Sequence, residues 1–269
     1  MSTATIEATG ARRRVGSVNS TPIPFTRLLR IELRKMFDTR SGWWALAGII
    51  VLSLIATGAT IIFGHRGELK YGDFAKAVGI PTTVILPVLG ALAVASEWGQ
   101  RTALTTFTLV PSRARVIGAK FAVVVAVGVV SVAVALAAGA LGNLINGAIA
   151  GITPVWNLPF NELSQIVLAD AIGMLMAFMF GAMFRNSAAA VIGYFVYALV
   201  LPGVSEALAG SQQWWHNNAA WFDLRTATIP LYDSGMTAHQ WAQLGVSTVI
   251  WLVIPLAVAI RLVLRSEVK

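Results

Sequence analysis

The sequence contains no cysteine, and charged residues make up only 12% of its 269 positions. The absence of cysteine excludes disulfide bonds and thiolate metal sites, and it leaves the redox compartment open. Soluble domains usually carry about 25% charged residues, so the scarcity of charge argues against a soluble protein. Apolar residues take their place, because 57% of the chain is hydrophobic and the mean hydropathy is +0.73. We therefore expect an integral membrane protein.

Catalytic signatures are missing as well. The sequence has no G-x-x-x-x-G-K-[ST] phosphate loop, no H-E-x-x-H zinc motif and no G-x-S-x-G nucleophile motif. The three histidines, His65, His216 and His239, are scattered outside the apolar runs and indicate no metal site. We expect no catalytic residue, no metal and no cofactor bound by this chain itself.

Six apolar runs dominate the sequence, and each is long enough to cross a hydrocarbon core of ~30 Å. They cover about 43–63, 78–96, 121–145, 163–184, 187–209 and 244–264. Backbone groups inside a bilayer must be satisfied within the segment, which favours helices, and no strand-like alternation supports a barrel. The expected fold is an all-α integral membrane protein with a six-span transmembrane domain over residues 43–269.

Two segments precede the first run. Residues 1–24, which include Arg12, Arg13 and Arg14, are predicted to form a flexible, basic cytoplasmic tail. Residues 25–42 are predicted to form an amphipathic interfacial helix, with a solvated juxtamembrane helix as the alternative. Its predicted apolar face consists of Phe25, Leu29, Leu33, Met36 and Phe37. Ile31 and Glu32 depart from this periodicity.

The positions of the basic residues predict an orientation. Sixteen of the 20 Lys and Arg residues fall in the N-terminal segment, residues 97–120, the link at Arg185 and the C-terminal end. Because Lys and Arg concentrate on the cytoplasmic side of membrane proteins, we expect these four regions and both termini to be cytoplasmic, in the cytoplasmic (inner or plasma) membrane. The same rule accounts for the net charge of +8 without a nucleic-acid partner.

The stretch "EWGQRTALTTFTLVPSRARVIGAK", residues 97–120, separates the second and third runs and is unusually polar for this chain. Ser112 can cap a helix that continues as "RARVIGAK" into the third span. The stretch would then be a stiff cytoplasmic extension of the membrane helices. The alternative is a solvated turn whose arginines only fix the topology.

This order of elements resembles the permease subunits of ATP-binding cassette exporters of the type-2 class, over nearly the whole chain after residue 25. The most specific part is the stretch 97–120. Permeases of this class often show an acidic residue at the end of the second span, a short helix containing Thr and Leu, a Pro-Ser-Arg turn and a Lys that opens the third span. Many members have Gly-Thr where this chain has Arg101 and Thr102.

The resemblance implies that the stretch is a coupling helix seated on a separate ATPase subunit. The residues it assigns to ATPase coupling are Glu97, Gln100, Arg101, Thr102, Leu104, Pro111, Arg113 and Lys120. It also implies an assembly of two ATPase subunits with two permease chains, as a homodimer or a heterodimer, in the lipid bilayer. ATP and Mg would bind to the ATPase, and a lipophilic or amphipathic substrate would move outward.

Two other functions are compatible with six spans. One is an ATP-independent secondary carrier or channel, and the other is a membrane-embedded enzyme, for which no convergent catalytic groups are found. Asp170 and Glu206 lie within the fourth and fifth runs, and since ionisable residues are costly in a membrane, both are candidates for a substrate path. Asp170 could instead lie near the outer headgroups. The aromatic segment 210–240 could form a re-entrant or interfacial helix, or an ordinary loop.

Overall fold

A computed structural model describes residues 23–38, 40–65, 67–99, 113–233 and 235–265. Helices are the only regular structure in these ranges, and six of them are long and apolar enough to span a membrane, which confirms the all-α prediction with six spans. The candidate spans cover Gly42–Phe63, Tyr71–Ser96, Ala114–Ala150, Phe160–Phe184, Ser187–Ser211 and Ala238–Leu264. The second, third and sixth begin six or seven residues before their apolar runs, because more polar first turns extend these helices beyond the hydrophobic residues.

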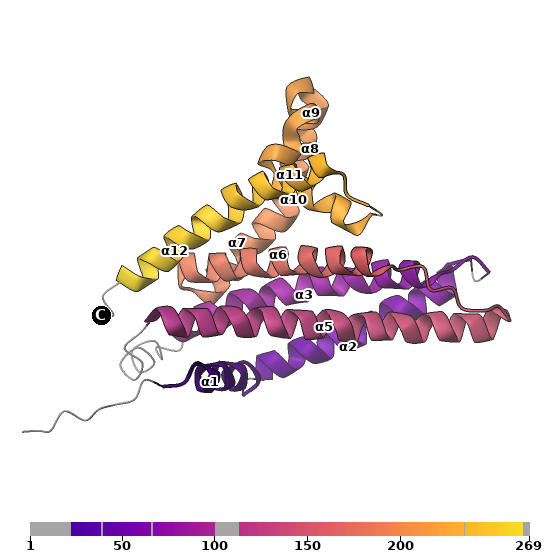
Figure 1. The fold of residues 1–269 in the computed structure, drawn as a ribbon, viewed down its shortest axis with the longest axis horizontal. Coiled ribbons are helices and arrows are strands. Elements are labelled where there is room, and N and C mark those ends of the chain that lie inside the picture. Colours follow the sequence, from indigo (N-terminus) through magenta and orange to yellow (C-terminus); the bar gives the residue numbers. More distant parts are fainter. Residues whose placement is uncertain (1–22, 39, 66, 100–112, 234, 266–269) are drawn as a thin grey trace, which may run out of the picture.

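The helices α3, α5 and α6 form the centre of the bundle. Helix α3 packs most extensively against α6, α5 and α2, and Figure 1 shows it between α5 and α6. The short helix α1 lies across α5 and α2. The bounds are α1 Phe25–Phe37, α2 Arg40–Phe63, α3 Tyr71–Gly99, α5 Arg113–Ala150 and α6 Phe160–Phe184. Helix α5 is therefore continuous from Arg113 through the third span, and α3 continues through two internal prolines.

The contact between α3 and α6 depends on two glycines. A Cβ atom at Gly90 would lie 2.5 Å from the carbonyl oxygen of Met174, and one at Gly181 would lie 2.6 Å from that of Ala91. Side chains at either position would push the two backbones apart. Close approach through small residues is a common way for membrane helices to pack, because van der Waals contact replaces the hydrophobic effect there.

The fifth and sixth spans each contain one wide π-helical turn followed by a proline. The turn Val196–Val200 precedes Pro202, and the turn Val249–Val253 precedes Pro255. Proline lacks an N–H donor and its ring collides with the carbonyl four residues earlier, so a locally wider turn accommodates it. The elements are α7 Ser187–Phe195, η1 Val196–Val200, α8 Leu201–Ser211, α11 Ala238–Thr248, η3 Val249–Val253 and α12 Ile254–Arg265.

The aromatic segment between these two spans is largely helical. It contains α9 Gln213–Phe222, α10 Leu224–Thr228 and the 3-10 turn η2 Ile229–Tyr232. Trp251 of the sixth span donates its indole N–H to the carbonyl of Phe222 at 2.5 Å, which ties α9 to that span. Helical structure favours the re-entrant or interfacial alternative over an irregular loop, and the depth of the segment in a membrane stays a prediction.

Candidate functional site

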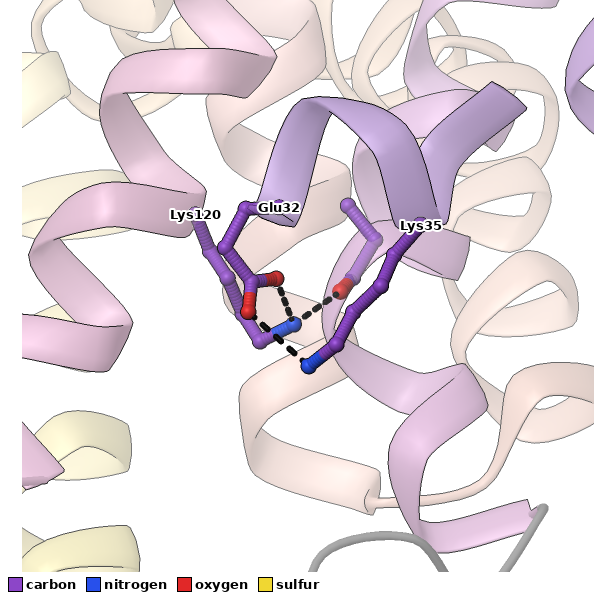
Figure 2. A network of polar contacts seen from close by, with 4 residues as sticks. Glu32, Lys35 and Lys120 are labelled. Atoms are coloured by element: carbon purple, nitrogen blue, oxygen red, sulfur yellow. Dashed lines mark hydrogen bonds and ion pairs between the residues drawn. The ribbon is translucent and has the colours of Figure 1, made fainter. Parts of the chain in front are cut away.

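Helix α1 is held to the bundle by a buried ion pair. Glu32 and Lys120 are 7% and 5% exposed, and the Lys120 Nζ lies 2.5 Å from Glu32 Oε2 (Figure 2). The same ammonium donates to the carbonyl of Ala93 at 3.3 Å, and Lys35 Nζ lies 3.0 Å from the other oxygen of Glu32. The cluster thus joins α1, the last part of α3 and the first part of α5.

This arrangement explains why Glu32 departs from the predicted periodicity of α1. The face of α1 that packs inward contains Leu28 and Glu32, whereas Phe25 and Leu33 of the predicted apolar face are exposed. A buried carboxylate requires a partner, and two lysines from different parts of the chain provide one. The mismatch in the helical pattern was the sequence signal that could have identified Glu32.

A second contact joins the same elements. Arg115, in the first turn of α5, donates to the carbonyl of Ile23, just before α1, at 2.6 Å. We name the group of Glu32, Lys35, Lys120, Arg115 and the Ala93 carbonyl the α1 junction. It lies beside the points where α3 ends and α5 begins, so it adjoins both ends of the predicted coupling segment.

Most of the predicted coupling segment lies outside the described residues. This applies to Gln100, Arg101, Thr102, Leu104 and Pro111. Glu97 belongs to the last turn of α3 and Arg113 is the first residue of α5. Lys120 is the one predicted coupling residue whose side chain is described, and it is buried against Glu32 within the chain. Its direct contact with an ATPase stays a prediction, and its described contacts are with Glu32 of α1 and the Ala93 carbonyl of α3.

Asp170 is buried between α3 and α6. It is 5% exposed, Thr82 Oγ1 donates to its Oδ2 at 3.3 Å, and its Oδ1 has no hydrogen-bond partner within the described part of the chain. Helix α6 begins at Phe160, so Asp170 lies about 15 Å along the axis at 1.5 Å per residue. Its position relative to the headgroups of a membrane stays a prediction. Glu206 is exposed on α8 and does not share this environment.

A cavity of about 440 Å³ opens at the end of the bundle opposite the α1 junction. It lies between the first turns of α3, the start of α6 and the segment α10–η2. Its lining includes Asp73, Lys76, Ile80, Thr83, Asn157, Leu158, Glu162, Ile166, Arg225, Leu231, Tyr232 and Asp233. Sequence reasoning did not identify this group, because its members come from four separate segments and follow no common motif.

Tyr232 is the phenol in this lining. Burial raises its pKa above the ordinary range, the nearby Asp170 raises it further, and Arg225 lowers it. Like an ordinary tyrosine, Tyr232 is protonated at neutral pH, and it contributes a phenol to the lining of the cavity. No three His, Cys, Asp or Glu side chains gather in the described residues in a way that could hold a metal ion.

Comparison with known proteins shows which family the chain matches. The model of a family described as "ABC-2 family transporter protein" matches residues 28–201, which is more than half of the chain and includes the α1 junction, Asp170, the first four candidate spans and part of the fifth. No curated protein matches the chain in sequence. The chain therefore belongs to the ABC-2 family of transporter proteins and is a membrane-embedded permease component of an ABC transporter.

Proposed function

We propose that this permease forms the membrane part of an exporter that is driven by a separate ATPase docking on residues 97–113. The observation that carries the proposal is the α1 junction, which fixes α1, α3 and α5 to one another beside that segment. ATP and Mg²⁺ would bind to the ATPase. Membership in the ABC-2 family argues against the secondary carrier, channel and enzyme alternatives.

Transmission of force from the ATPase to the membrane helices requires a rigid α1 junction. A displacement of the segment 97–113 acts on the end of α3 and the start of α5, and Lys120 bonds both to α1 through Glu32 and the Ala93 carbonyl. Since α3 also packs tightly on α6 through Gly90 and Gly181, the movement would pass to the centre of the bundle as a whole. Flexible loops alone could not transmit it.

The exposed spans favour a second permease chain. The first, fifth and sixth spans are the least buried, and large apolar side chains such as Ile55, Leu199 and Val253 are exposed on them. Lipid covers part of this surface, and we propose that another permease chain covers the rest, with two ATPase subunits completing the assembly. The conduit for a lipophilic or amphipathic substrate would then lie between the two permease chains.

The experiment on coupling compares Glu97→Ala and Arg101→Ala with Arg66→Ala, a change on the predicted outer side. The permease is coexpressed with its proposed ATPase partner, and the retained ATPase and its hydrolysis rate are measured. Truncating one charge at a desolvated subunit contact costs about 2–5 kcal/mol, so both coupling variants should lose ATPase capture or stimulated hydrolysis. Exposed charges contribute only about 0–1 kcal/mol to folding, so expression should stay normal.

Export direction is tested with inside-out membrane vesicles and a panel of amphipathic fluorescent dyes. Addition of ATP should drive dye into vesicles that contain both subunits and not into vesicles with Glu97→Ala permease. If both coupling variants behave like Arg66→Ala in capture, hydrolysis and dye uptake, the segment only sets topology and the coupling proposal is wrong.

We further propose that Asp170 acts on the substrate path, whereas the exposed Glu206 contributes less. Asp170→Asn keeps the shape of the side chain and the contact with Thr82 while it removes the charge. We expect normal assembly with the ATPase and reduced dye uptake. Unchanged uptake together with unchanged assembly would exclude a functional role for this charge.

A further inference from the structure

We propose that the cavity at the end of the bundle opposite the α1 junction binds a zwitterionic headgroup, with a phosphate held by Lys76 and Arg225 and an ammonium held by Glu162 and Asp233. This inference extends the proposed function. It rests on that function in one respect, the side of the membrane that the cavity faces. The occupant to which it commits is a single phospholipid of the phosphatidylethanolamine type.

The charges in this cavity lack partners of their own. Within the described residues, no ion pair or hydrogen bond engages the charged groups of Lys76, Glu162, Arg225 and Asp233, although all four residues line the same space. Asp73 is partly engaged, because its carboxylate accepts from the backbone N–H of Lys70 at 2.9 Å. Unpaired charges of both signs facing one cavity are what a ligand with both charges would satisfy.

The balance of charge selects the ligand class. A purely anionic ligand would meet three carboxylates, from Asp73, Glu162 and Asp233, and a purely cationic one would meet Lys76 and Arg225. A zwitterion places each of its charges opposite the complementary group. Arg suits phosphate in particular, because its guanidinium can donate two parallel hydrogen bonds to the phosphate oxygens.

The walls of the cavity are built by specific contacts. The backbone N–H of Gly72 donates to Asn157 Oδ1 at 2.8 Å and that of Tyr71 donates to the Val155 carbonyl at 3.0 Å, so the chain after α5 is fixed against the start of α3. On the other side, the backbone N–H of Arg225 donates to Asp223 Oδ1 at 2.9 Å, and this bond positions the first turn of α10.

Size and position match a lipid headgroup. A volume of about 440 Å³ falls within the usual range for small-molecule sites. Lys76 is the sixth residue of α3 and Glu162 is the third of α6, so both lie near the ends of candidate spans. Tyr71, at the start of α3, packs on Trp156, as aromatic residues do at headgroup level. Apolar lining residues, Ile80 and Ile166 among them, can cover the glycerol and the first methylenes.

The test measures ligand binding by native mass spectrometry of the purified full-length permease in detergent, without the ATPase. The probes are dihexanoyl phosphatidylethanolamine, dihexanoyl phosphatidylglycerol and free phosphoethanolamine. The variants are Lys76→Gln and Glu162→Gln. Their matched controls are Lys70→Gln and Glu68→Gln, which are exposed at the same end of the bundle but do not line the cavity.

We expect one phosphatidylethanolamine per chain, with phosphatidylglycerol bound about tenfold more weakly. Loss of one charged hydrogen bond of about 1.5 kcal/mol corresponds to roughly a tenfold weaker affinity, so both variants should lose this much for phosphatidylethanolamine. Glu162→Gln should not weaken phosphatidylglycerol, whereas Lys76→Gln should weaken both lipids. The two controls should match the unmodified chain.

Three results would overturn the proposal. They are equal binding of phosphatidylglycerol and phosphatidylethanolamine, unchanged phosphatidylethanolamine binding by Glu162→Gln, and equal losses in variants and controls. Free phosphoethanolamine binding as tightly as the lipid would support the headgroup chemistry and assign it to a soluble source. Because the ATPase is absent, failure here leaves the coupling proposal standing, and failure of coupling leaves this measurement interpretable.

Discussion

At the end of the bundle where α5 begins, Glu32 and Lys120 are almost fully buried and satisfy each other, with Lys35 and the Ala93 carbonyl completing the group. At the opposite end, Lys76 and Glu162 line an open cavity and form no pair within the described residues. The charged residues at the α1 junction join helices to one another. Those that line the cavity remain available to another molecule. We propose on this basis that the two ends serve different tasks, mechanical connection at one and recognition at the other.

We expect the largest contrast between the ends to be the side of the membrane that each faces. Single cysteines at Ser17, Ser112, Ser211 and Ser234 can be probed with a membrane-impermeant thiol reagent, and the absence of native cysteine gives no background. We expect the last two to be labelled in intact cells and the first two only after lysis. Labelling of the first pair alone would reverse the assignment of the ends.

The two ends should also differ in how much a single charged residue contributes to the free energy of unfolding. Lys120→Met removes one of the two lysines that contact the buried Glu32 in the described part of the chain, and removal of one partner from a buried pair costs about 3–5 kcal/mol of unfolding free energy. Lys76→Met, in the open cavity, should cost about 0–1 kcal/mol. The free energy of unfolding in SDS titration measures both.

A double variant sharpens this comparison. Replacement of a buried ion pair by apolar residues of similar volume is often neutral, so Glu32→Leu with Lys120→Met should recover most of the stability that Lys120→Met loses. If Lys120→Met is no less stable than Lys76→Met, the two ends do not differ in the way that the structure indicates.

The two ends are connected by the contact of α3 with α6. A substitution at Gly181 tests how tight this contact is. Gly181→Ala introduces a Cβ 2.6 Å from the Ala91 carbonyl, and overpacking of this kind costs about 1–3 kcal/mol. Gly118→Ala, in α5 near the α1 junction, meets no atom within 4 Å and should be neutral or slightly stabilising. Equal thermal midpoints for the two variants would contradict the tight contact.

The smallest expected effect concerns an exposed pair on α1. Arg34 Nε lies 3.3 Å from Asp38 Oδ2, and both side chains are largely exposed, at 80% and 63%. Asp38→Ala should change the free energy of unfolding by at most about 1 kcal/mol, far less than Lys120→Met on the same measurement. A loss as large as that of Lys120→Met would show that burial does not decide the value of these pairs.

Sequence alone predicted the six spans because each is a long apolar run, and such runs need no knowledge of neighbouring helices. It also identified Asp170 as an intramembrane charge and Lys120 as part of a family pattern. It could not pair Lys120 with Glu32, since 88 residues separate them and the contact depends on how α1 lies across α5.

The cavity and the glycine contact were beyond sequence reasoning for the same reason. Lys76, Glu162 and Arg225 come together only after α3, α6 and α10 are packed. Gly90 and Gly181 resemble many other glycines in the chain until the distance to the facing backbone is known. The start of α3 was also missed, because its polar first turn does not belong to the apolar run that predicted the span.

The central claim is that the end of the bundle at the α1 junction receives the ATPase. A photo-crosslinking residue, p-benzoylphenylalanine, can replace Arg101 in one version of the permease and Arg66 in another, and each is irradiated in membranes that contain the ATPase. We predict a covalent permease–ATPase product from position 101 and none from position 66. The same product from both positions, or from position 66 alone, would contradict the claim.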